Sequence, residues 1–298
     1  MVELLEATTR GLGQGSLYAL LGLGFVIIYK TTRVVNFAQP VLMILGAYFT
    51  SAFALDHGMP FWVAFALAIV VTAAVAGVVE RIAMRPMVGE PDFSAAMVTI
   101  GIFFVLNVIA ADLIGNGQRG VGDPWGLDTF TVGEVSIFES DVARVVIAAV
   151  TVAALGLFFE RSRHGVAMQA SAFSQETALA QGVPVGRMIG LAWVLAGALG
   201  AIAGMMVGAG GGGFDQTTTL VALKALPAII LGGLDSIRGA IVGGVIIGLA
   251  EAYTKTYQPQ HAEWLGSNFD QVVPYVVMLL VLLVRPYGLF GTPEVKRV

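Results

Sequence analysis

Long stretches without a charged residue are the feature that most limits what this chain can fold into. Five windows contain no Asp, Glu, Lys or Arg: residues 11–29, 34–55, 57–79, 93–111 and 188–214. A transmembrane helix needs about 20 mostly apolar residues, and each window is about that long. The windows are uniformly apolar rather than alternating, which favours helices over the strands of a membrane barrel.

Four further windows are shorter or carry a charge. They are residues 145–159, 216–234, 239–250 and 271–284. Together the nine windows predict an all-α integral membrane protein, a bundle of eight or nine transmembrane helices in a single domain over residues 1–298. The composition agrees, since 57% of the residues are hydrophobic and 12% charged, whereas soluble domains have about 45–50% and about 25%. The net charge of −4 argues against a nucleic-acid partner, and the absence of cysteine excludes disulfides and thiolate metal sites.

The Lys and Arg residues predict the orientation, because they concentrate in cytoplasmic loops. If the amino terminus lies outside and nine spans alternate, 11 of the 16 basic residues fall on the inner side. This places residues 161–187 and the carboxyl terminus in the cytoplasm of a bacterium and makes the chain a multi-pass plasma-membrane protein. The loop 115–141 then lies outside. It is either a docking surface for an external partner or a solvated connector, and its sequence predicts a short hairpin around Gly133.

The segment 165–185, GVAMQASAFSQETALAQGVPV, is polar and alanine-rich although it lies between two apolar windows. Glycine at its start and glycine and proline at its end are typical helix boundaries, and the residues between them favour a short helix. Its side chains at Met168, Ala172, Gln175 and Leu179 are spaced to share one helical face. The helix is too polar to span a membrane and lacks the basic face of a lipid-surface helix. It is a linker or a docking element.

This segment resembles the cytoplasmic coupling loop of the branched-chain amino acid permease family of ABC importers, the LivH type. The matching positions are Gly165, Ala167, Ala170, Ala172, Glu176, Ala178 and Gly182. Gln169 stands where the family usually has Arg. Four more motifs of this family follow its order and spacing: NFAQP (36–40, with Gln39 and Pro40 in place of His and Gly), ERIAMRPMVG (80–89), ALPAIILGGLDSIRGAIVGGVIIGLAE (225–251) and RPYGLFG (285–291).

The resemblance implies the ABC importer permease fold and a transport subunit that is not an enzyme. The implied partners are an identical or paralogous permease subunit, two cytoplasmic ATPase subunits, an extracytoplasmic solute-binding protein and the lipid bilayer. ATP and Mg would be bound by the ATPases, and no cofactor by this chain. The residues implied in ATPase coupling are Met168, Gln169, Ala170, Ala172, Phe173, Glu176, Ala178, Leu179 and Gly182. The implied solute is a branched-chain or other hydrophobic amino acid; relatives carry urea, short amides, carboxylates or steroid-like compounds.

Polar residues inside the spans are costly and are therefore functional candidates. Those predicted to line a translocation path are Gln14, Asn36, Gln39, Thr99 and Asn107. For Gln14 the alternative is a hydrogen bond between packed helices, and for Asn36 and Gln39 it is a structural kink at Pro40. Lys224, within an apolar window, is expected to extend its ammonium group toward water.

Small residues recur at four-residue spacing in the last third of the chain. The rows are Gly200, Gly204 and Gly208, then Gly239 with Gly243, and Gly244 with Gly248. Such rows let helix backbones approach closely. They pack helices either within one subunit or between subunits.

Several function classes lack their sequence signatures. No Lys follows a Gly, so a phosphate-binding loop of the form GxxxxGK[ST] does not occur, and His57, His164 and His261 are too far apart for HExxH. A stand-alone secondary transporter is the alternative to an importer subunit. It predicts ion-coupling carboxylates near the middle of the bilayer, and the alternation of spans places none there. An intramembrane enzyme would need a catalytic pair within the spans, and none is visible.

Overall fold

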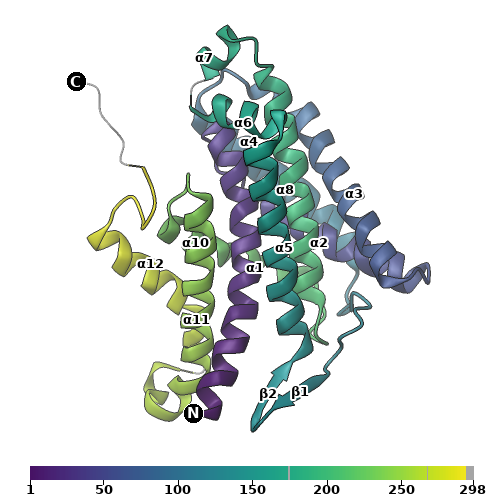
Figure 1. Ribbon diagram of the computed structural model, residues 1–298. Helices are drawn as coiled ribbons and strands as arrows, with labels where there is room; N and C mark the ends of the chain where they lie inside the picture. The colour runs from purple at the N-terminus through teal and green to yellow at the C-terminus, as the bar shows by residue number, and fades with distance from the viewer. Residues whose placement is uncertain (174, 267, 293–298) are drawn as a thin grey trace.

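The computed structural model describes residues 1–173, 175–266 and 268–292, and the side chains of residues 175 and 176 are outside this description. Long helices run side by side in one bundle (Figure 1). The two-stranded hairpin of β1 (Thr129–Val132) and β2 (Val135–Phe138) lies at one end, the hairpin end, together with the amino terminus. The short helices α6 (Arg163–Phe173) and α7 (Gln175–Ala180) lie at the other, the α6 end.

The remaining helices follow the chain back and forth between these ends. They are α1 (Val2–Thr32), α2 (Gln39–Ser51), α3 (Phe61–Val79), α4 (Asp92–Ile114), α5 (Glu139–Arg161), α8 (Val185–Gly208), α9 (Thr219–Leu223), α10 (Ala225–Gly232), α11 (Ile237–His261) and α12 (Val273–Val284). π-Helical turns extend α2 over Ala52–Asp56 and α3 over Glu80–Met84, and 3-10 turns cover Arg85–Met87, Gln216–Thr218, Glu263–Leu265 and Phe269–Gln271.

Six of the described helices are long and apolar enough to cross a membrane, and two apolar helical stretches, Gln216–Gly232 and Val273–Val284, are shorter. The six differ in what covers them. The apolar window of α1 is 89% buried by other parts of the chain, whereas the windows of α4 and α5 are 17% and 11% buried. Helix α1 is therefore the centre of the bundle, and the apolar faces of α4 and α5 are available to lipid.

Glycines allow the helices around α1 to approach its backbone. A Cβ atom at Gly15 would lie 2.8 Å from the Cα of Val245 in α11, and one at Gly248 would overlap the backbone nitrogen of Gly15. Gly244 faces Ala19 in the same way. The glycine-rich amino-terminal helix thus gains close van der Waals contact where lipid supplies no hydrophobic drive for helix association.

The other glycine rows also contact helices of the same chain. Gly200 and Gly204 lie against Leu42 and Met43 of α2, and Gly208 lies against Val121. Gly239 and Gly243 face the backbone of α10 at Gly232 and Ala228. All seven glycines of the predicted rows therefore have neighbours within one subunit.

We expect Gly204→Ala to destabilise the protein, because the added methyl group would overlap the carbonyl oxygen of Met43. Overpacking of this kind typically costs about 1–3 kcal/mol. The matched control is Gly101→Ala in α4, where no atom lies within 4 Å of the added methyl group. Thermal unfolding in detergent should give a lower Tm for the first variant only; equal Tm values would contradict the close contact between α2 and α8.

The chain breaks between α1 and α2 inside the bundle. Arg33 has a left-handed backbone (φ 61°), residues 34–38 are irregular, and α2 begins at Gln39 with Pro40 in its first turn. Gln39 lies against Gly24, eight residues before the end of α1, so α2 begins about 12 Å below that end. Proline suits this place because the first helical N–H groups have no partner within the helix.

The loop between α4 and α5 is tied to the hairpin end of the bundle. Its strands pair antiparallel from Thr129–Phe138 to Val132–Val135, and Gly133 in the turn has φ 67°. The hairpin expected around Gly133 is confirmed. The backbone nitrogen of Ser136 donates to Glu6 of α1 at 3.0 Å, and Arg119 pairs with Asp56 at 2.6 Å.

Asp215 begins the helical stretch that leads into α9. Its carboxylate accepts hydrogen bonds from the hydroxyl and backbone N–H of Thr217 and from the hydroxyl of Thr218. These bonds, led by that from the Thr217 side chain, lower the pKa of Asp215. The contribution of this cap to stability is therefore present at neutral pH and is lost as the pH falls through the lowered value.

Candidate functional site: the α6–α7 segment and the helices that hold it

Helices α6 and α7 form a compact segment at one end of the bundle (Figure 1). Helix α6 packs on α5, α8 and α1, and α7 packs on α8. One residue separates α5 from α6, and four residues separate α7 from α8, so short connections join the segment to two long helices. A force on the segment would therefore be transmitted to α5 and α8.

The inner side of the segment is anchored. Met168, Ser171 and Ala178 are 1–3% exposed. Gly165 lies against the backbone of Phe158 and Phe159, where a Cβ atom would overlap the carbonyl oxygen of Phe158. The Nε2 of Gln169 donates to the carbonyl oxygen of Phe159 at 2.7 Å. Gln169 therefore caps the end of α5 in this chain.

The outer side of the segment presents apolar side chains to the surroundings. Phe173 is 93% exposed and Leu179 is 59% exposed. Ala170 is also exposed, Ala172 is half-buried, and Gly182 ends the segment with φ 79°. Phe173 and Leu179 are thus exposed apolar side chains on a segment whose other side is anchored.

The shared helical face predicted from Met168 to Leu179 is wrong at its far end. Met168 is buried, but among the described side chains of α7 Ala178 is buried and Leu179 is 59% exposed. The side chain of Glu176 lies outside the described residues, and its predicted role stays a prediction.

An ion pair between Glu80 and Arg85, which was not expected from the sequence, packs against the start of α8. Arg85 and Glu80 form an ion pair (Nε–Oε1 3.2 Å), and the Glu80 side chain is 3% exposed. The pair packs against α8 at two glycines, since a Cβ atom at Gly186 would overlap Arg85, and one at Gly190 would lie 3.2 Å from Glu80. The ERIAMRP motif thus contacts α8 one turn after the segment. The ERIAMRP motif could have drawn attention to Glu80 and Arg85, but nothing in the sequence predicted that they pack against Gly186 and Gly190.

Two further motifs meet at the same end of the molecule. The backbone N–H groups of Leu289 and Phe290 donate to the carbonyl oxygens of Leu231 and Gly232 at 2.8 and 2.9 Å. Thr292 bonds to Asp235 in the turn between α10 and α11. The carboxyl-terminal RPYGLFG sequence therefore closes the end of α10.

Three of the predicted path residues lie in the interior near the break before α2. Gln39 is fully buried and its Nε2 donates to the carbonyl oxygen of Ala196 at 3.1 Å. Asn36 is also fully buried, and its Oδ1 accepts from the backbone nitrogen of Ala38. The hydroxyl of Thr99 accepts from the backbone nitrogen of Phe37 at 3.1 Å. These bonds stabilise the break between α1 and α2. The remaining path residue on α4, Asn107, lies two turns beyond Thr99 and is half-buried.

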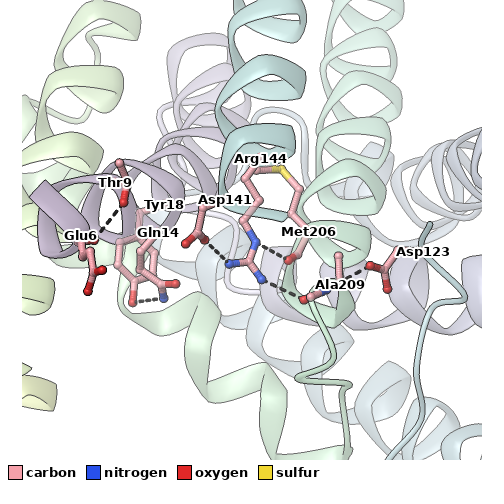
Figure 2. A network of polar contacts seen from close by, with 10 residues as sticks. Glu6, Thr9, Gln14, Tyr18, Asp123, Asp141, Arg144, Met206 and Ala209 are labelled. Carbon is pink, nitrogen blue, oxygen red and sulfur yellow. Dashed lines mark hydrogen bonds and ion pairs between the residues drawn. The ribbon is translucent and has the colours of Figure 1, made fainter. Parts of the chain in front are cut away.

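The fifth, Gln14, is half-buried and belongs to a second polar chain, whose bond between Gln14 and Tyr18 is drawn in Figure 2. Its Nε2 donates to the hydroxyl of Tyr18 at 2.8 Å, and that hydroxyl donates to Glu251 at 2.6 Å. Lys224 pairs with the same carboxylate (Nζ–Oε1 2.5 Å). The sequence predicted that the ammonium group of Lys224 extends toward water and did not predict this acceptor from α11.

A second buried charge, also missed, fastens α5 to α8 (Figure 2). Arg144 pairs with Asp141 at 2.9 Å and donates to the carbonyl oxygens of Met206 and Ala209 at 3.0 and 2.9 Å. The spacing of three residues between Asp141 and Arg144 was visible in the sequence, but the carbonyl acceptors on α8 were not.

Two cavities open at the α6 end. One of about 570 Å³ lies between α1, α5, α6 and the start of α11, and one of about 760 Å³ lies beside it toward α12. Both are bordered by Gln169, Ala172 and Asp235. None of the five predicted path residues borders either cavity among the described residues.

The chain matches one family over nearly its whole length. The model of the "Branched-chain amino acid transport system / permease component" family matches residues 7–282. The chain belongs to this family. It is a permease component of the ABC importer type and not an enzyme.

Named relatives agree with this membership. The chain is 30% identical to the high-affinity branched-chain amino acid transport system permease protein LivH of Escherichia coli K12, over 99% of this chain and 97% of that protein. It is 31% identical to the corresponding permease protein BraD of Pseudomonas aeruginosa, over 99% and 98%. Among solved structures, a metal-chelate type ABC transporter in an inward-facing conformation is similar in fold (TM-score 0.51, 15% identity, 94% of this chain and 85% of that chain).

Proposed function

We propose that this permease imports branched-chain or related hydrophobic amino acids. We also propose that the α6–α7 segment contacts a cytoplasmic ATPase and moves when the ATPase changes conformation. The observation that carries the proposal is the contrast within the segment: Met168 and Ala178 are anchored, while Phe173 is 93% exposed. A helix that inserts into a partner's groove needs this arrangement, an apolar anchor on an element rigidly joined to its own fold. We assign Phe173 and Leu179 as the principal contacts, with Gln169, Ala170, Ala172, Glu176 and Gly182 beside them.

The number of passes and the sidedness are part of the proposal. The six long helices, the two shorter apolar stretches and α2 with its π-helical turn give nine passes. An odd number agrees with the positions of the two ends of the chain. Phe290 and Thr292 border the same cavity as Met168, whereas the amino terminus lies at the hairpin end. With the basic residues inside, the α6 end is cytoplasmic and the hairpin faces an extracytoplasmic binding protein.

The nature of the solute is supported by the 570 Å³ cavity beside α1 and α5. Its border has charges of both signs, including Lys30, Asp235 and Arg238, together with apolar side chains such as Ile27 and Leu155. A zwitterion with an apolar side chain fits such a border better than urea or a carboxylate does. We place the inner part of the path here, against an identical or paralogous permease subunit. We keep Gln14, Asn36, Gln39, Thr99 and Asn107 as residues whose helices must move when the path opens.

The proposed mechanism is alternating access. ATP and Mg bind to the ATPase subunits, and closure of the ATPase dimer moves the α6–α7 segment as a rigid body. Because the segment continues into α5 and α8, the movement changes the packing around α1 and opens the path to a delivered solute. The stand-alone secondary transporter receives no support from the interior. Each buried carboxylate among the described residues, Glu80, Asp141 and Glu251, has a basic partner.

The test is uptake by proteoliposomes that contain the permease with its two ATPases and binding protein. We expect saturable uptake of radiolabelled leucine that requires ATP and that isoleucine and valine inhibit. The control is the same complex with an ATPase variant that lacks the phosphate-binding lysine. Uptake of urea or a short amide in place of leucine would contradict the substrate, and uptake driven by an ion gradient without ATP would contradict the importer mechanism.

A further inference from the structure

An open groove of about 380 Å³ lies at the hairpin end of the bundle. Its aromatic border is formed by Trp62 in the first turn of α3, Trp125 in the loop between α4 and α5, and Phe130 of β1. The rest of its border is the start of α5, beginning with Glu139. The groove thus lies where two spans begin, at the level at which lipid headgroups meet the hydrocarbon layer.

The two tryptophans form a fixed corner of the groove. Their rings are nearly perpendicular (83°), and the ring centroids are 5.9 Å apart. Phe61 packs against both rings, with centroids 5.1 Å from Trp62 and 5.6 Å from Trp125. The backbone N–H of Gly126 donates to the carboxylate of Asp123 at 3.0 Å, and the same oxygen accepts from the loop after α8. The turn that carries Trp125 is therefore held in place by the rest of the chain.

Glu139 supplies the only charge on the border of the groove among the described residues. It is half-buried and belongs to none of the ion pairs in the described part of the chain. Its backbone N–H donates to the carbonyl oxygen of Asp128 at 3.1 Å, and the N–H of Asp128 donates to the carbonyl oxygen of Trp125 at 3.0 Å. These bonds hold the carboxylate beside the aromatic corner. Aromatic faces and a carboxylate both attract a cation and both repel an anion.

The wall that α5 contributes beyond Glu139 is apolar. Val142 and Val146 follow Glu139 by three and seven residues, so the three side chains share one helical face. The valines lie about 4.5 Å and about 10.5 Å further along the helix axis, and they are 41% and 54% exposed. The apolar window of α5 is 11% buried by the rest of the chain. From the end of the span inward, the groove thus presents a charge and then an apolar strip that faces hydrocarbon.

We propose that this groove binds a phospholipid whose headgroup carries a primary ammonium group, as phosphatidylethanolamine does. The ammonium group donates to the carboxylate of Glu139 and lies against the rings of Trp62 and Trp125. An acyl chain extends along Val142 and Val146. The order of groups in the lipid, with the charged head first and the chain beneath it, matches the order along α5. The groove is separate from the proposed path and from the α6–α7 segment, so this inference does not rest on the proposed function.

Binding is tested by native mass spectrometry on the delipidated permease in detergent, with equimolar dioleoyl lipids that differ only in the headgroup. We expect phosphatidylethanolamine to bind about tenfold more tightly than phosphatidylglycerol, because a hydrogen bond to a charged group contributes roughly that factor. Phosphatidylcholine should lie between them, since its quaternary ammonium group attracts the rings but has no N–H to donate to Glu139. Equal binding of phosphatidylethanolamine and phosphatidylglycerol would overturn the inference and leave the rings as ordinary interfacial anchors.

Two substitutions locate the site. Glu139→Gln keeps the shape and removes the charge, so the preference for phosphatidylethanolamine over phosphatidylglycerol should disappear. Its matched control is Glu134→Gln in the hairpin turn, which should keep the preference. Trp62→Leu removes one ring of the corner and should weaken binding of phosphatidylethanolamine and phosphatidylcholine alike, by about threefold; Trp264→Leu, at a residue 84% exposed, is its control. An unchanged preference after Glu139→Gln would overturn the inference.

A basic side chain of the binding protein has related chemistry, but the exposed valines beneath Glu139 favour a lipid. Association of the binding protein with the permease is therefore measured in nanodiscs of phosphatidylglycerol, which leave the groove free of ammonium headgroups. We expect the wild type and Glu139→Gln to bind it equally. Weaker association of the variant would make the protein the occupant and overturn the assignment to a lipid. Leucine uptake by an importer without the lipid preference contradicts this inference alone, and the preference without uptake contradicts the proposed function alone.

Discussion

Replacing Phe173 with Arg should uncouple the importer while leaving the permease folded. Phe173 is 93% exposed in the free chain, so the substitution removes no contact within the bundle. In the assembled complex it would place a charge where an apolar anchor enters the ATPase. Loss of a central anchor of an interface typically costs about 2 kcal/mol or more, which corresponds to roughly thirtyfold weaker association. We expect uptake in proteoliposomes and the stimulation of ATPase activity by loaded binding protein to fall at least tenfold.

Phe130→Arg is the matched control for folding and is judged by Tm alone, because the hairpin is proposed to face the binding protein. Phe130 is a half-exposed phenylalanine in β1 of the hairpin, at the opposite end of the molecule. Both variants add one positive charge at an exposed aromatic position, so a general effect of charge on insertion or folding would affect both. Tm values in detergent should equal that of the wild type for both. If Phe173→Arg retains normal stimulation and uptake, the α6–α7 segment is not the contact with the ATPase.

Much of the helical architecture could be predicted because a membrane constrains each span strongly. The charge-free window 93–111 became α4, Asp92–Ile114, since about 20 apolar residues in lipid have no stable alternative to a helix. Helix α1 is less well predicted at its start. It begins at Val2, nine residues before the window, because the polar first turns extend the helix beyond the apolar layer, where hydropathy carries no information.

Breaks inside apolar windows are harder to predict. Residues 34–38 at the start of the window 34–55 are irregular, and α2 begins only at Gln39, although the whole window is apolar. Pro40 was the only local signal. The reason for the break is tertiary, because Gln39 fits against Gly24 of α1 and bonds to Ala196 of α8. No single segment contains that information.

The candidate site shows the same division. The exposed Phe173 could be expected from a polar segment between two spans, but the anchored side could not be assigned from helical spacing alone. The packing of α5 and α8 determines which side of the segment is anchored, since Met168 and Ala178 are buried and Leu179 is left exposed. The ion pair of Glu80 with Arg85 was equally hidden. Residues five apart do not face each other in an α-helix, and the π-helical turn over Glu80–Met84 brings them together.

Breaking the pair of Lys224 with Glu251 should destabilise the protein more than Gly204→Ala does. The two side chains are 19% and 11% exposed; Lys224 lies between α9 and α10, and Glu251 lies 27 residues later in α11. Removing one partner of a buried pair leaves an uncompensated charge and typically costs about 3–5 kcal/mol. We expect Lys224→Met and Glu251→Met each to lower the Tm in detergent clearly, and Glu251→Met also to leave the hydroxyl of Tyr18 without its acceptor.

The double variant decides what the pair contributes. If the cost of each single variant comes from the charge that is left behind, Lys224→Met with Glu251→Met should recover most of the loss, because no buried charge remains. Asp56→Asn is the matched control. It breaks the more exposed pair with Arg119 at the same end of the bundle and should change stability by no more than about 1 kcal/mol. Additive losses in the double variant would instead mean that Lys224 and Glu251 stabilise the fold independently, through packing against α1 and α11 rather than through their mutual attraction.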